Sequence, residues 1–99
     1  MANDNSTEVI SAWREEIASY LKEMHNFKEL NDPIEILRTL SSFSARGSYM
    51  RSLVVRSQSK PVQAFRYDEL DHFLKEVDLQ FRIWSRVAAL NKDEWEMTR

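Results

Sequence analysis

The stretch ILRTLSSFSARGSYMRSLV, residues 36–54, decides the fold of this chain. Its large apolar residues and the chain's single glycine recur at steps that alternate between four and three. Such steps place every member on one stripe of an α-helix. The stripe consists of Ile36, Leu40, Phe43, Gly47, Met50 and Val54. We therefore expect an amphipathic helix here, with this stripe facing the core.

Both flanks of this stretch carry a signal for the start of a helix. In NDP, residues 31–33, Asp32 can cap a helix that has Pro33 at its first position and Glu35 three residues after the cap. SKP, residues 59–61, again places a proline where a helix can begin. One Gly and two Pro are too few for the frequent turns of a β protein. Three helices are expected, at about 6–28, 33–58 and 62–97.

The outer two segments repeat the helical spacing. The first stripe consists of Ile10, Trp13, Ile17, Tyr20, Met24 and Phe27, and the third of Leu70, Leu74, Val77, Phe81, Trp84 and Ala88. Short connections between helices favour antiparallel neighbours, and heptad spacing favours shallow crossing angles. The sequence thus predicts one all-α domain over residues 1–99. It is expected to be an up-down-up three-helix bundle with coiled-coil-like packing and a long C-terminal helix.

Two local points stay open at this stage. Gly47 either breaks the second helix or marks a close contact between helices, and the unbroken phase of the stripe favours the contact. Residues 60–68 are either the first turns of the third helix or a loop before a new helix start at Asp68.

The third helix carries more apolar residues than its stripe needs. Ile83, Val87 and Leu90 form a second line that widens the apolar face of a helix longer than its neighbours. The first two helices could cover this face, but a second copy or a partner is the interpretation that we favour. Trp95 is expected to be exposed or bound by a partner. The candidate residues for self-association or docking are Phe73, Ile83, Val87, Leu90 and Trp95.

The charges are unevenly distributed along the chain. Residues 36–67 contain no acid, whereas the first 35 residues sum to −5 and the last 32 to −3. Arg38 and Arg56 are expected to point outward with no acid within reach of helical pairing. The candidate residues for contact with a partner or a phosphate are Arg38, Arg46, Tyr49, Arg51, Ser52, Arg56, Lys60 and Arg66.

A structural explanation exists for two of these arginines. Arg46 and Arg51 flank the core, and an antiparallel hairpin would bring them opposite Glu76 and Asp71 of the third helix. Such pairs fix register and contribute about 0–1 kcal/mol each when exposed.

The sequence lacks the usual patterns of catalytic and metal sites. It has no cysteine, one glycine, and two histidines, His25 and His72, without a neighbour at a recognised ligand spacing. We therefore expect no enzyme, cofactor, metal or small-molecule substrate. The polar N-terminus is not a secretory signal, and no apolar run could span a membrane. A cytoplasmic protein is the resulting expectation.

Two functions remain at this stage. The first is a non-enzymatic adaptor, inhibitor or oligomeric subunit, of the accessory kind often encoded by bacteria and their phages. It would bind a protein partner and self-associate through the C-terminal helix. The alternative is an oligomeric nucleic-acid-binding accessory protein, in which residues 36–67 track a phosphate backbone while Tyr49, Phe65 or Tyr67 stacks on bases.

Overall fold

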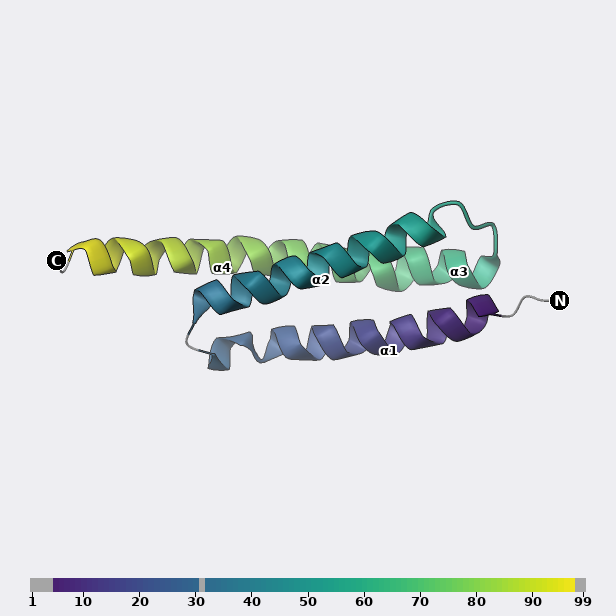
Figure 1. Ribbon diagram of the computed structural model, residues 1–99, viewed down its shortest axis with the longest axis horizontal. Helices are drawn as coiled ribbons and strands as arrows, with labels where there is room; N and C mark the ends of the chain where they lie inside the picture. The colour runs from purple at the N-terminus through teal and green to yellow at the C-terminus, as the bar shows by residue number, and fades with distance from the viewer. Residues whose placement is uncertain (1–4, 31, 98–99) are drawn as a thin grey trace.

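The computed structural model describes residues 5–30 and 32–97, with side chains for residues 7–30 and 32–90. The described residues form helices and contain no strand, which confirms the all-α class. Three rods lie side by side, and the chain reverses direction between the first and second and again between the second and third (Figure 1). The elements are α1 (Asn5–His25), the short 3-10 helix η1 (Phe27–Glu29), α2 (Pro33–Val54), α3 (Lys60–Ala64), the π-helix η2 (Phe65–Leu70) and α4 (Asp71–Met97).

The start of α2 is as expected, and its end comes earlier. Asp32 Oδ1 accepts hydrogen bonds from the backbone N–H groups of Ile34 and Glu35, at 3.1 and 3.3 Å, and Pro33 follows the cap. The helix ends at Val54, four residues before the expected boundary. Val54 is the last apolar member of the stripe, and the residues that follow offer no further anchor to the core. The chain turns there before α3 begins.

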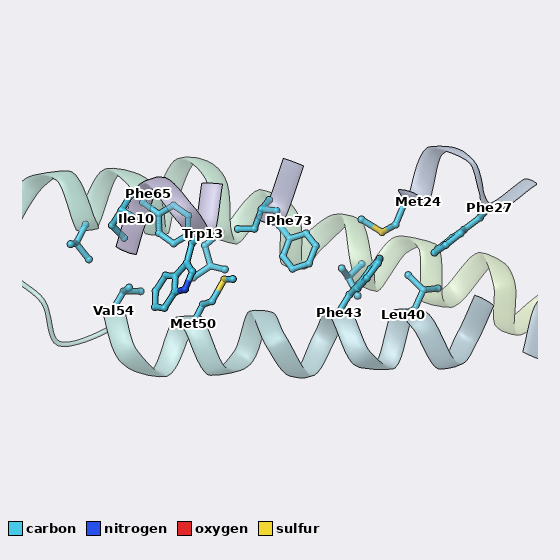
Figure 2. Close-up of a cluster of buried hydrophobic side chains, with 14 of the residues drawn as sticks. Ile10, Trp13, Met24, Phe27, Leu40, Phe43, Met50, Val54, Phe65 and Phe73 are labelled. Carbon is cyan, nitrogen blue, oxygen red and sulfur yellow. The ribbon is translucent and has the colours of Figure 1, made fainter. Parts of the chain in front are cut away.

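The core runs along the inside of all three rods (Figure 2). Trp13 and Phe65 meet near one end, with ring centroids 6.0 Å apart, and Phe27 and Phe43 stack near the other at 6.5 Å. The buried apolar side chains are Ile10, Trp13, Ile17, Met24, Phe27, Ile36, Leu40, Phe43, Met50, Val54, Val62, Phe65, Leu70, Phe73 and Val77. Most members of the three predicted stripes are among them.

The helices α2 and α4 pack closely at Gly47. A Cβ on Gly47 would lie 2.5 Å from Leu74 Cδ2, so the glycine marks a contact and leaves α2 unbroken, as expected. The packing of α1 against α2 relies on aromatic rings instead. Tyr20 stacks on Phe43 with the ring centroids 4.3 Å apart.

A continuous helix runs from α3 through η2 into α4, so residues 60–68 are not a loop. The π-helix bonds residue i to i+5 and thereby fits one extra residue into a turn. Phe65 and Leu70 are five residues apart, a step that an ordinary α-helix would not keep on one face. Both side chains are fully buried because the π-helix absorbs the extra residue.

The last part of α4 extends past η1 and the start of α2 (Figure 1). Phe27 of η1 meets Trp84 of α4 edge to face, with 6.5 Å between the ring centroids. This contact lies near the end of the three-rod bundle. The protrusion contributes to an elongated molecule of 66 × 22 × 16 Å.

Candidate interaction surfaces

An apolar surface lies on α4 beside the core. Leu79, Ile83, Val87 and Leu90, here named the α4 stripe, follow one another at steps of four, four and three. Leu79, Ile83 and Leu90 are 49%, 45% and 61% exposed, and Val87 is partly buried. The rest of the chain therefore leaves much of this stripe uncovered. The segment 79–90 holds Arg82 and Arg86 and no acidic residue.

Two other residues were expected to take part in docking. Phe73 is fully buried, and its ring packs near those of Tyr20 and Phe43, so its assignment to a docking surface is wrong. Its position one residue from Leu74 places it within the same wide core-facing surface of the helix. Trp95 lies outside the residues whose side chains are described.

The structure assigns Arg46 a different partner from the one expected. Its Nε donates to Glu16 Oε2 at 2.6 Å and its Nη2 to Glu16 Oε1 at 3.0 Å, so the pairing with Glu76 is wrong. Tyr20 also donates its hydroxyl hydrogen to Glu16, at 2.5 Å. This forked ion pair bridges α2 and α1, and therefore fixes the register of these two helices.

The charges in this network shift one another's titration. The hydrogen bond from Arg46 holds the pKa of Glu16 below its usual value, although burial opposes the shift. Burial, followed by the bond to Glu16, raises the pKa of Tyr20. The carboxylate likewise raises the pKa of Arg46. All three groups are thus held in the protonation state that the network requires at neutral pH.

The expected pair of Arg51 with Asp71 does not form among the described residues. Arg51 and Asp71 instead line one open pocket, together with Leu74, Lys75 and Asp78. Two acids and two bases therefore share this part of the surface.

Arg38 is exposed, as expected, but the expectation that no acid lies within reach of helical pairing was wrong. Arg38 Nη1 lies 3.1 Å from Glu35 Oε1, because this acid stands one residue before the acid-free segment and one helical turn from Arg38. Arg66 Nη1 donates to the Val55 carbonyl at 3.5 Å, and its guanidinium lies over the Tyr67 ring. Three of the six bases of the segment thus have partners within the chain, whereas Arg56 and Lys60 are exposed.

A groove lies between the first half of α1 and the second half of α2, and sequence reasoning missed it. This α1–α2 groove has a volume of about 540 Å³. Tyr49 and Leu53, 52% and 53% exposed, stand on its α2 side, and Val9 on its α1 side. One signal was available, because Tyr49 and Leu53 form an i,i+4 apolar pair outside the core stripe. The remaining lining residues are Ile10, Trp13, Arg46, Val54, Ser57 and Val62.

The two histidines line a smaller pocket of about 190 Å³ with Glu76 and Gln80, although they are distant in sequence. Over the described part of the chain, no group of three or more His, Cys, Asp or Glu side chains could hold a metal ion. The two imidazoles and the one carboxylate of this pocket are therefore not arranged to bind a metal ion.

None of the known protein families, curated proteins or solved structures compared with this chain matches it. Across residues 5–30 and 32–97, no helix combines the length and apolar character needed to cross a membrane.

Proposed function

We propose that this protein is a non-enzymatic helical interaction protein that docks on a protein partner, or on a second copy, through the α4 stripe. The observation that carries this proposal is the exposure of Leu79, Ile83 and Leu90 on one line of a helix that extends beyond its bundle. Apolar surface of this kind on a protruding helix is a common feature of interaction sites.

The mechanism is burial of the stripe for affinity, with charge setting the orientation. Apolar area removed from water contributes roughly 25 cal/mol per Å². Arg82 and Arg86 border the stripe, and Arg82 pairs with Asp78 at 2.8 Å. A partner with an acidic rim around an apolar groove therefore suits this segment. Rim charges of this sort mainly raise the rate of encounter.

The nucleic-acid alternative has less support. Arg38 and Arg46 are already paired with glutamates, so the basic segment offers a phosphate backbone fewer available cations than its sequence indicates. Affinity for a phosphate backbone depends on the number of neutralised phosphates, and a short row of cations gives little at physiological salt.

Light scattering over a range of protein concentrations, with Val87→Glu/Leu90→Glu as the variant, tests the proposed function. We expect the variant to lose the association that the α4 stripe holds, seen as a smaller mass at high protein concentration, while its helical content and unfolding midpoint are kept. Ile34→Glu is the matched control, because Ile34 is an equally exposed apolar residue away from the stripe. A strict monomer would remove self-association and leave only a different protein as partner. Loss of the fold in the variant would show that the stripe is core and would refute the proposal.

A further inference from the structure

We propose that a second copy of this chain covers the α1–α2 groove, with α2 of each copy lying antiparallel on α1 of the other. The two copies are related by a twofold axis that runs along the bundle. This interface is separate from the α4 stripe, so it goes beyond the proposed function and leaves the stripe accessible to another protein.

The groove has apolar walls that this chain does not cover. Val9 on α1 and Tyr49 and Leu53 on α2 are all exposed beside the largely buried Trp13. Two helical hairpins placed face to face form a bundle of four helices with antiparallel neighbours, and such a bundle buries the apolar walls of both grooves. Helices of 21 and 22 residues provide a face about 30 Å long for this contact.

Contacts within one chain set the heights of residues along the bundle. Arg46 pairs with Glu16, and Tyr20 stacks on Phe43, so residues of α1 and α2 whose numbers sum to 62 or 63 lie at the same height. A twofold axis along the bundle preserves these heights. Each α2 residue therefore lies at the height of the α1 residue of the second copy whose number, added to its own, gives about 62 or 63.

This register places opposite charges together. Arg56 comes to the height of Glu8 of the second copy, within about two residues. Arg38 comes equally near the height of Glu23, and this contact requires it to exchange its exposed pair with Glu35. Arg38 and Arg56 point the same way on α2, because eighteen residues make about five turns. Glu8 and Glu23 differ in direction by about 60° on α1. The basic side of α2 therefore meets an acidic side of α1, which is the complementarity expected of a specific interface.

Side-chain sizes match in the same register. Tyr49 faces the exposed Ala12 of the second copy, so its ring has a small residue to pack on, and Leu53 faces Val9. A large side chain set over a small one lets the facing helices interdigitate. The Arg46–Glu16 pairs of the two copies fall at one height. They form a polar layer that favours this register over a shifted one.

Disulfide trapping tests the contact directly, because the natural chain has no cysteine. Ala12→Cys and Tyr49→Cys, both at exposed positions, are made in separate chains and mixed under mild oxidation. We expect a cross-linked product of twice the chain mass that exceeds the product from either variant alone. Leu90→Cys mixed with Tyr49→Cys is the matched control and should cross-link no more than the single variants. Equal cross-linking in all mixtures would overturn the proposed pairing.

Charge reversal gives an independent readout that does not depend on cysteine chemistry. Arg56→Glu or Glu8→Arg should weaken the dimer roughly tenfold in a dilution series followed by light scattering, since each twofold dimer contains the pair twice. The double variant should recover the original dissociation constant. A double variant no stronger than the single ones, or a wild-type chain that is strictly monomeric, would refute this interface. If Val87→Glu/Leu90→Glu keeps the Ala12–Tyr49 cross-link, the two surfaces are independent, whereas loss of the cross-link in that folded variant would place self-association on α4 instead.

Discussion

Gly47 of α2 lies directly against Leu74 of α4. A Cβ at residue 47 would stand 2.5 Å from Leu74 Cδ2 and 3.1 Å from Phe73 Cε2. The first distance is too short for a carbon contact, so the two helices can approach this closely only because residue 47 has no side chain. The glycine costs the helix about 1 kcal/mol relative to alanine, and the close packing of α2 against α4 offsets that cost.

Gly47→Ala should lower the free energy of unfolding by about 1 kcal/mol. The new methyl group gains about 1 kcal/mol of helix propensity but overpacks the contact, which typically costs 1–3 kcal/mol. Leu74 can move the end of its side chain, whereas Phe73 is fully buried and cannot yield easily. Chemical denaturation monitored by circular dichroism measures the difference.

The same substitution in a Leu74→Ala background is the control. Removal of the leucine methyl groups clears the nearest obstruction, so Gly47→Ala should become neutral or stabilising there. This change of sign is a coupling between residues in contact. If Gly47→Ala costs the same in both backgrounds, the Leu74 contact does not limit the approach of the helices.

The network that Glu16 forms with Arg46 and Tyr20 predicts that the free energy of unfolding falls at acidic pH. Because the folded state lowers the pKa of Glu16, the unfolded chain takes up its proton first as the pH falls. The stabilisation is therefore present above the ordinary glutamate pKa and lost as the pH falls through the lowered one. Glu16→Gln should be less stable at pH 7 and should lose less stability between neutral and acidic pH than the wild type.

Glu69→Gln is the matched control for this experiment. Glu69 of η2 pairs with Arg14 of α1 at 2.5 Å, and both side chains are more exposed than that of Glu16. Glu69→Gln should change the free energy of unfolding at pH 7 by less than Glu16→Gln does, because exposed pairs are screened. Tyr20 of the same network predicts a second loss of stability, at alkaline pH. Its raised pKa means that the unfolded state ionises first above pH 10, so stability falls as the pH rises there.

Periodicity alone predicted the helices and much of the core, because steps of three and four, as in residues 36–54, place the apolar side chains on one face of a helix. The same reasoning placed Asp32 at a cap and Gly47 at a contact. It could not assign Arg46 to Glu16, because the periodicity of separate helices says nothing about which pair of helices a charge will bridge. It excluded Phe73 from the core because a single stripe is narrower than the face that three packed helices bury.

The exposure of the α4 stripe makes a prediction about stability. Ile83→Glu should change the free energy of unfolding of the isolated chain by less than about 0.5 kcal/mol, because the residue is 45% exposed. Val77→Glu on the same helix is the control and should cost more than about 3 kcal/mol, since Val77 is buried and the charge would have no partner. Equal effects would mean that both residues belong to one core.

Nucleic-acid binding should be weak and should vanish at physiological salt. The available cations of the basic segment are few, because Arg38 and Arg46 already contact glutamates. Fluorescence anisotropy with a labelled oligonucleotide measures this at low and physiological salt, with Arg38→Glu/Arg56→Glu as the control. Tight binding that persists at high salt and is lost in the double variant would favour the nucleic-acid function over docking of a protein.

The π-helix predicts that one deletion will be tolerated where a neighbouring one will not. Phe65 and Leu70 both face the core although they are five residues apart. Deletion of the exposed Tyr67 shortens this step to four, the spacing of an ordinary α-helix, so both side chains keep their face. We expect the deletion variant to retain its helical content, with a change in unfolding free energy within about 1 kcal/mol.

Deletion of Lys75 is the matched control, because Lys75 is also exposed but lies in the regular part of the helix. This deletion rotates all later residues by about 100° relative to earlier ones, so Val77 and Phe81 would leave the core. The variant should lose its cooperative unfolding transition, which thermal melts followed by circular dichroism would show. If the two deletions were equally damaging, the extra residue in η2 would be a required part of the packing and not an insertion that the helix absorbs.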